Sequence, residues 1–288
     1  NIHAAIKNPI TIEKLYANNF RTLLFYGQAL CRIGSKIYDA PFYSSYRDIY
    51  KTAEDAFGKY DFYFSLVNLA NKKAQKFITK KISEAVDDCE TSLKVLTEEN
   101  FKLEQKIAAQ NWPSAVEEGK EFKKFYRKEI QKIINDLNSE FDLNELENGI
   151  HELRRKMRWL SMYAHALPGS IVLSEKSNPS TYQYPFLTKE AFDLPFNQVS
   201  SHKQIKPYIT LPSEDFVAVG WLITELGKIK DKAMIEAAIY AAQHESEILE
   251  KKIPAGIKIE ATSAAQQKVA LVIDQHQLLN NLLKSIKD

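Results

Sequence analysis

The chain has 288 residues, 44% of them hydrophobic, and its 39 basic against 37 acidic residues leave a net charge of only +2. A charge this close to zero gives no global field for nucleic acid, so we expect no specific nucleic-acid partner, and any anion site must be a local patch. Cys31 and Cys89 are too few for a disulfide framework or a zinc set, which favours a reducing, cytoplasmic location. No apolar run is long enough to predict a membrane span.

Helix dominates the prediction for the first part of the chain. Nine glycines are few for this length, and Leu, Ala, Lys, Glu and Ile are abundant, which favours helix over sheet. Apolar periodicity predicts helices over 13–37, 42–57 and 61–81, and a fourth that begins at Ser83 or Asp87 and ends at Gln110. Gly58 is expected to break the chain between the second and the third of these. Residues 1–110 would form a first helical bundle.

Two further helices follow a turn at Trp112-Pro113-Ser114, where Pro113 lies near a first helical position. Residues 117–138 are predicted to form a basic helix within a connecting segment, 111–141. A helix over 142–167 then opens a second bundle, 142–288, and ends at Pro168-Gly169.

Residues 168–212 differ in kind, because they lack a sustained period and are rich in proline. The prolines after Pro168 are Pro179, Pro185, Pro195, Pro207 and Pro212. We expect a long irregular excursion with a short strand at 208–211. Helices should then resume from Ser213 to about 251, with a break near Gly227, and from 262 to 286. The predicted fold is therefore all-α, with two related helical bundles and a long irregular insertion in the second.

The strongest functional lead is a basic stripe on the predicted helix 142–167. At roughly 100° per residue, four side chains share one arc of the helix: His151, Arg154, Arg155 and Arg158. A separate arc is apolar and suits a core: Leu153, Met157, Leu160 and Ala164. Guanidinium forks match phosphate oxygens, and an imidazole can donate a further hydrogen bond. The stripe therefore predicts an anion site, and the alternative is a solvated basic face.

A second basic feature lies in the preceding helix. Lys124, Arg127 and Lys128 alternate with apolar residues in an ordinary amphipathic pattern, which suits a solvated face. A short turn would lay this helix antiparallel to the stripe helix. The two basic faces could then share one groove, so these three residues are weaker candidates for anion binding.

Two segments of the chain resemble each other. Asn18 to Arg21 leads into LLFYGQAL much as His151 to Arg154 leads into KMRWLSMYAHAL, and the string AFGKYD ending at Asp61 is similar to ELGKIKD ending at Asp231. Repetition of this kind predicts two related helical units.

These motifs resemble the conserved-histidine α-helical domain (CHAD) family. In that family each of two helical halves opens with a His-x-x-Arg helix and carries a Leu-Gly-x-x-(Arg/Lys)-Asp element on a later helix. The second half fits both elements, through His151, Arg154 and Arg158 and then through Leu226, Gly227, Lys230 and Asp231. In the first half Arg21 is kept, Asn18 stands in the histidine position and Phe25 in the next basic position.

The resemblance implies a non-enzymatic module that binds inorganic polyphosphate, or another phosphate-rich anion, in a basic groove between the halves. His151, Arg154 and Arg158 would make the principal contacts, with Arg155, Arg21 and Lys230 as weaker candidates. Asp61 and Asp231 could be catalytic carboxylates, but a structural ion pair to an arginine is the more economical role.

The chain lacks the motifs of catalysis. It has no phosphate-cradling glycine loop, no dinucleotide fingerprint and no nucleophile context, and His151-Glu152 lacks the second histidine of a zinc helix. We expect no enzyme activity, no cofactor and no metal; a phosphohydrolase would need a carboxylate cluster. The competing hypothesis is a helical scaffold without an anion site, which would bind a protein partner through 170–212. The aromatic side chains available for that contact are Tyr182, Tyr184, Phe186 and Phe192.

Overall fold

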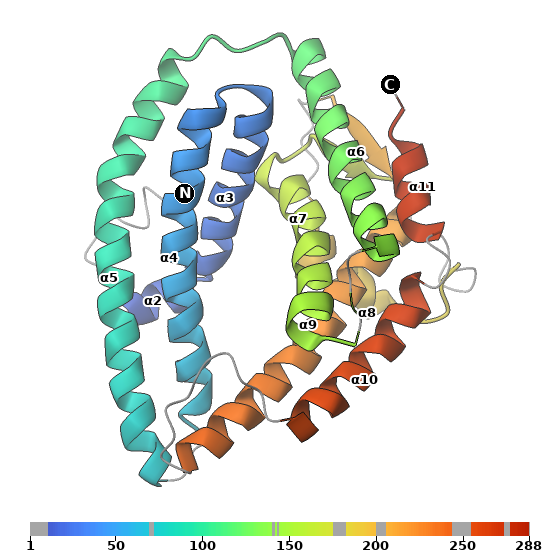
Figure 1. The fold of residues 1–288 in the computed structure, drawn as a ribbon. Helices are drawn as coiled ribbons and strands as arrows, with labels where there is room; N and C mark the ends of the chain where they lie inside the picture. The colour runs from blue at the N-terminus through green and yellow to red at the C-terminus, as the bar shows by residue number, and fades with distance from the viewer. Residues whose placement is uncertain are drawn as a thin grey trace. The chain divides into compact units, whose positions relative to one another are not determined.

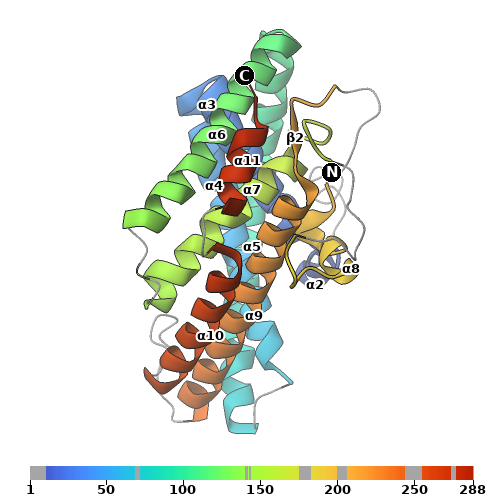
Figure 2. The ribbon, with the colours of Figure 1, turned by 90° about the vertical axis from the view of Figure 1, so that its right-hand side faces the viewer.

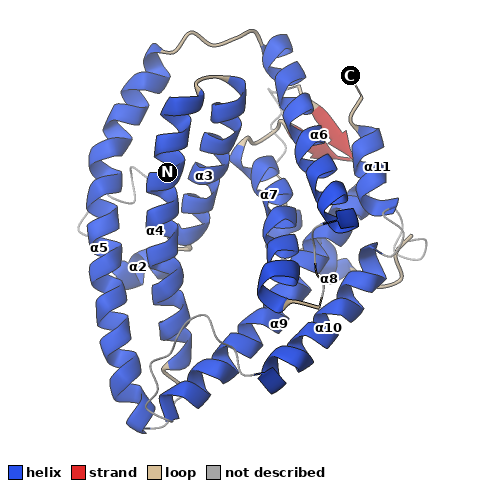
Figure 3. Ribbon diagram, viewed as in Figure 1, coloured by secondary structure: helices blue, strands red, loops and turns tan. Residues whose placement is uncertain are grey.

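The computed structural model describes residues 11–68, 72–139, 142, 144–174, 183–199, 206–243, 255–273 and 277–287. The chain divides into two compact units. The first comprises residues up to Pro113 together with 237–250, and the second comprises Ser114–Glu236 and residues from Lys251 onward. The fold is all-α within the described ranges, apart from two strands of three residues each (Figure 3). The predicted connecting helix lies wholly in the second unit rather than between the two.

Helices α2 (Ile12–Ala17), α3 (Phe20–Ile37), α4 (Ala40–Leu66) and α5 (Lys72–Ala109) build the first unit. α3 packs against α4 and α4 against α5, as Figure 1 shows in blue and cyan. The predicted helix 13–37 is interrupted at Asn19, whose backbone is left-handed with φ of 55°. Asparagine tolerates this conformation, and it separates α2 from α3.

Close contacts between α3 and α4 follow an antiparallel register. The ring of Tyr50 lies against Gly27 and the ring of Tyr43 against Gly34, so that a Cβ at either glycine would be 2.6 Å from ring carbons. The tyrosine hydroxyls donate to side chains of neighbouring elements, Tyr50 to Asn100 of α5 and Tyr43 to Gln110. The tyrosine-rich helix therefore buries its rings while keeping its hydroxyls hydrogen-bonded.

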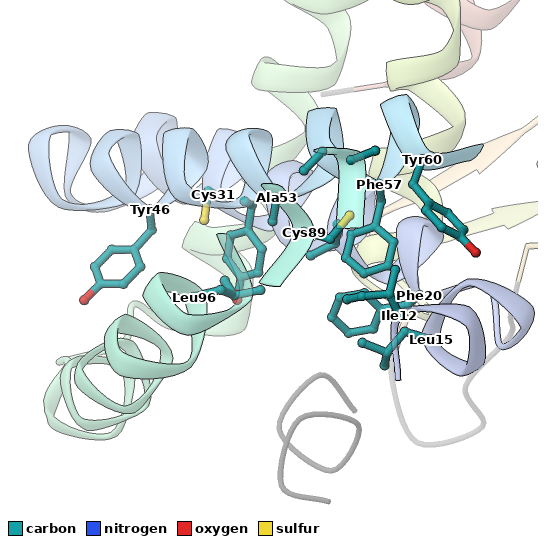
Figure 4. Packing of buried hydrophobic residues seen from close by; sticks show 14 of the residues in the cluster. Ile12, Leu15, Phe20, Cys31, Tyr46, Ala53, Phe57, Tyr60, Cys89 and Leu96 are labelled. Carbon is teal, nitrogen blue, oxygen red and sulfur yellow. The ribbon is translucent and has the colours of Figure 1, made fainter. Parts of the chain in front are cut away.

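Figure 4 shows the core of the first unit, where Phe57 lies beside Phe20 and Cys89 of α5, and Leu96 of α5 lies further along the same cluster, near Ala53. Phe57 and Cys89 are fully buried, and Phe20 and Tyr60 are 1% exposed. The rings of Phe20 and Phe57 lie 5.2 Å apart. Burial of such large apolar side chains holds α2 to α5 together, at roughly 2–3 kcal/mol for each ring removed from water.

The second unit contains α6 (Ala115–Ser139), α7 (Glu152–Ala166), α10 (Ala255–Ile273), α11 (Gln277–Ser285) and most of α9 (Ser213–Gln243). α6 packs against α7 and α11. α10 runs beside α9 in Figures 1 and 2, and Lys268 of α10 is 3.2 Å from the Glu225 carboxylate of α9.

The predicted core arc of α7 is confirmed. Leu153, Met157 and Ala164 are fully buried and Leu160 is 1% exposed. Tyr126 of α6 donates its hydroxyl to the Leu160 carbonyl at 3.1 Å, which joins the two helices inside this core.

The excursion after α7 contains two strands, β1 (Ile171–Leu173) and β2 (Ile209–Leu211), paired in parallel with Ile171 opposite Ile209. β2 matches the predicted strand, whereas β1 was not predicted. A helical turn, α8 (Lys189–Phe192), and a 3-10 turn at Pro195–Asn197 lie between them.

Both predicted glycine breaks are wrong. α4 continues through Gly58 and α9 through Gly227, because each glycine lies against an arginine side chain instead of ending a helix. The final helix also differs: α10 begins at Ala255 rather than near 262, and α11 is separate from it. Across the described residues, no helix is both long and apolar enough to cross a membrane.

Candidate functional site

His151 lies where a short π-helical segment, Leu146–His151, joins α7. The Ile150 amide donates to the Glu145 carbonyl five residues back, at 3.0 Å, which is the spacing of a π turn. Helix α10 packs against this segment, and Lys258 of α10 forms an ion pair with Glu145 at 2.6 Å. These contacts fix the position of His151 at the start of α7. The predicted helix 142–167 thus holds from 152, with a wider turn before it.

The surroundings of His151 disfavour its charged form. Its Nδ1 is buried and has no hydrogen-bond partner among the described residues. Burial, and after it the nearby charges of Lys230, Arg154, Arg158 and Arg155 in that order, together lower the pKa of His151 to about 4. The four charges that act most strongly on the imidazole are thus all cations. A neutral histidine amid cations is a place where an anion would be stabilised.

Arg154 is held against α9 by the backbone. Its Nε donates to the Ile223 carbonyl at 3.0 Å. The guanidinium lies so close to Gly227 that a Cβ there would be 2.6 Å from Nη2. A side chain at 227 would displace the guanidinium, so glycine is what allows the helix and the arginine to meet.

Arg21 makes the corresponding contact in the first unit. A Cβ at Gly58 would lie 2.7 Å from Arg21 Nη2. Here two carboxylates form ion pairs with the guanidinium: Glu54 is 2.7 Å from Nη2 and Asp61 is 3.0 Å from Nη1. Tyr16 also donates to Asp61 at 2.7 Å. Asp61 therefore makes the ion pair predicted for it, and Arg21 is engaged by this cluster rather than presented to an external anion.

The two arginine–glycine contacts differ in the charges around them. In the first unit, Glu54 lies four residues before Gly58 and Asp61 three residues after it. In the second unit, the corresponding positions around Gly227 are Ile223 and Lys230. Four residues after the arginine stand Phe25 and Arg158. The first unit thus sets one cation against two carboxylates, and the second places three cations at the same positions beside His151.

This register corrects the ion pair with an arginine that the sequence predicts for Asp231. Counted from the glycine, Lys230 occupies the place of Asp61, and Asp231 is one residue further along. Asp231 is exposed and has no ion-pair partner within the described ranges, since Arg154 reaches the Ile223 carbonyl instead. The sequence strings suggested the wrong alignment because both end in aspartate.

Arg155 departs from the rest of the predicted stripe. It is exposed and pairs with Glu152 one turn earlier, with Nη2 to Oε2 at 2.6 Å. Arg154, Arg158 and Lys230 are half-buried. We call His151, Arg154, Arg158 and Lys230 the His151 site; Lys230, predicted as a weaker candidate, is the cation with the largest effect on the imidazole.

The structure does not bring the α6 cations to the His151 site. Lys124, Arg127 and Lys128 line a different cavity of about 1190 Å³, the α6 cavity, formed with residues 167–170 and 206–208. Arg127 donates from Nη1 to the Ile286 carbonyl, and Lys124 is 3.5 Å from Glu121. The expectation of one shared groove is wrong, because these side chains follow a face of α6 that borders the excursion.

The aromatic contact surface predicted for 170–212 is also not formed by its described members. Phe192 is 3% exposed. Phe186 lies 4.4 Å from the ring of Trp221, and Tyr184 donates to the buried Asp215 at 2.5 Å. These rings fasten the excursion to α9 instead of facing a partner. Tyr182 lies outside the described residues.

The described part of the chain shows neither a metal-binding cluster nor a reactive cysteine. No group of three or more His, Cys, Asp or Glu side chains there could hold a metal ion. Burial raises the pKa of both cysteines, Cys31 and Cys89, to about 12, so their thiols stay protonated. This is the behaviour of core residues rather than of nucleophiles.

Comparison with known proteins identifies no relative: no family model, no curated protein and no solved structure matches the chain.

Proposed function

We propose that the chain is a non-enzymatic, CHAD-like binding module for inorganic polyphosphate or another phosphate-rich anion, which the His151 site of the second unit holds. The observation that carries this proposal is the half-buried imidazole of His151, whose Nδ1 has no hydrogen-bond partner among the described residues and whose pKa is lowered by four nearby cations. An anion supplies both an acceptor for the imidazolium and a counter-charge for the arginines.

Preorganisation supports the same proposal. The Ile223 carbonyl and Gly227 hold the Arg154 guanidinium in one place, so little side-chain freedom remains to be lost when an anion binds. The local charge around the arginine–glycine contact also differs between the units. In the first unit the carboxylates of Glu54 and Asp61 lie beside Arg21, whereas the second unit has Ile223 and Lys230 at the corresponding positions.

Titration of the whole protein with long-chain polyphosphate tests the proposal. Binding should saturate at low salt and weaken by about 20- to 50-fold between 50 and 200 mM salt, as expected for three or four cations exchanging counterions. Arg158→Ala should weaken binding by about tenfold or more, because a charged hydrogen bond is lost.

The matched control is Arg47→Ala, which removes a partly exposed arginine that pairs with its neighbour Asp48. It should leave the affinity unchanged. Absence of binding at low salt, or equal losses in Arg158→Ala and Arg47→Ala, would contradict the proposal.

A further inference from the structure

The α6 cavity combines a cationic wall with an apolar one. Its cations come from a single stripe of α6 and from the end of the excursion: Lys120, Lys123, Lys124, Arg127, Lys128 and Lys206. Glu118 is its only carboxylate among the lining residues. The stripe from Lys120 to Lys128 covers about 12 Å along the helix axis.

Most of these cations have no internal counter-charge. Lys120, Lys123, Lys128 and Lys206 form no ion pair with any carboxylate that the structure describes. Glu118 is itself hydrogen-bonded to Tyr208. A row of like charges on one helix face is destabilising unless opposite charges neutralise it, so the cavity is complementary to a row of negative charges.

Most of the remaining lining residues are apolar. Leu167, Pro168 and Pro207 contribute side chains, and Tyr208 packs its ring on Gly119, where a Cβ would lie 2.7 Å from the ring. Val116, which also lines the cavity, is 82% exposed. An inorganic phosphate chain would leave this apolar surface exposed to water, so a ligand that is partly apolar fits the cavity better.

We propose that the α6 cavity docks an acidic, amphipathic peptide segment of a partner protein, with carboxylates against the lysine stripe and aliphatic or aromatic side chains against Leu167, Pro168 and Pro207. The volume of about 1190 Å³ exceeds the roughly 300–1,000 Å³ of pockets for drug-sized ligands and suits several residues of a chain. The concave shape does not fit a duplex, and one tyrosine already packed on Gly119 offers no stacking platform for single strands.

Selection from a phage-displayed library of random 12-residue peptides on the full-length protein tests this proposal. Enriched peptides should intersperse Asp and Glu with Leu, Ile, Phe or Trp. The selected peptides, labelled with a fluorophore, should bind the Lys123→Gln/Lys206→Gln variant about fivefold more weakly (roughly 1 kcal/mol), because two ion pairs are lost. Lys132→Gln is the matched control, since Lys132 lies on α6, pairs with Glu129 and does not line the cavity.

Three results would overturn the proposal: no enriched peptides, enriched peptides without acidic residues, or equal affinity for the double variant and Lys132→Gln. Anionic phosphatidylglycerol vesicles or a single-stranded oligonucleotide that bind through Lys123 and Lys206, when the peptides do not, would assign the cavity to another ligand. The outcome is separate from that of polyphosphate titration, because the cavity and the His151 site share no residue.

Discussion

Substituting alanine for each of the two arginine-bound glycines should have unequal effects, although the local geometry is alike. At both positions the new Cβ would lie within 2.7 Å of a guanidinium nitrogen, so the arginine must move. In both, replacing glycine in a helix interior gains about 1 kcal/mol of helix propensity. The difference in stability comes from the partner groups that each arginine loses when it moves.

In Gly58→Ala, Arg21 withdraws from Glu54 and Asp61, and the Glu54 side chain is only 10% exposed. Leaving a mostly buried carboxylate without its partner costs about 2–3 kcal/mol, so the variant should be about 1–2 kcal/mol less stable than wild type. In Gly227→Ala, Arg154 loses one bond to the Ile223 carbonyl, worth about 1 kcal/mol, so the net change should be close to zero.

Urea unfolding followed by far-ultraviolet circular dichroism measures both free energies. Polyphosphate affinity should show the reverse order, weakened in Gly227→Ala and unchanged in Gly58→Ala. A Gly58→Ala variant as stable as wild type, or a Gly227→Ala variant less stable than Gly58→Ala, would refute this prediction.

Three further outcomes follow from the packing and the pKa shifts. The folded pKa of His151 is depressed to about 4, so its stabilising contribution is complete above the unfolded pKa of about 6.5 and is lost as pH falls through 4. Between pH 7 and 4, the free energy of unfolding in urea should therefore fall by about 1–2 kcal/mol more in wild type than in His151→Gln, after allowance for solvent screening. The same pH dependence in both proteins would contradict this. Gly27→Ala forces a Cβ to within 2.6 Å of the buried Tyr50 ring and should cost about 1–3 kcal/mol by the same assay, whereas an unchanged midpoint would mean that α3 and α4 can separate freely. Cys31 and Cys89 should react with a thiol reagent only after unfolding, and rapid native-state labelling would show that their burial is wrong.

The helices could be predicted from the sequence because their apolar periods are long and regular. The core arc of α7 is an example, since Leu153 to Ala164 recurs at helical spacing and is buried. The interruption at Asn19 could not be found in the same way. Its left-handed backbone is a single-residue event, and the apolar pattern continues on both sides of it.

Glycine was the main source of error. A glycine inside a helical pattern is ambiguous in sequence, because a break and a close approach require the same residue. Gly58 and Gly227 serve close approach, and the partner arginines lie 37 and 73 residues away in the chain, too far for any local pattern to connect them. The spacing of Glu54 and Asp61 around Gly58 was the available signal.

The candidate site was predicted in part. The stripe on α7 placed His151, Arg154 and Arg158 on one face from helical spacing alone. The neighbourhood of Lys230 depends on how α9 packs on α7, and the separation of Lys124, Arg127 and Lys128 into another cavity depends on the excursion. Both are tertiary features that a 3.6-residue period does not contain.

The most direct test of the central claim is the pKa of His151, measured by nuclear magnetic resonance of the histidine ring protons with and without long-chain polyphosphate at constant ionic strength. We expect a pKa of about 4 in the free protein and a value about one unit or more higher in the complex, because a bound anion stabilises the imidazolium. Polyphosphate affinity would then rise as pH falls from 7 towards 5 in wild type but not in His151→Gln. The same pKa in both states, with polyphosphate bound, would place the anion away from His151 and contradict the account.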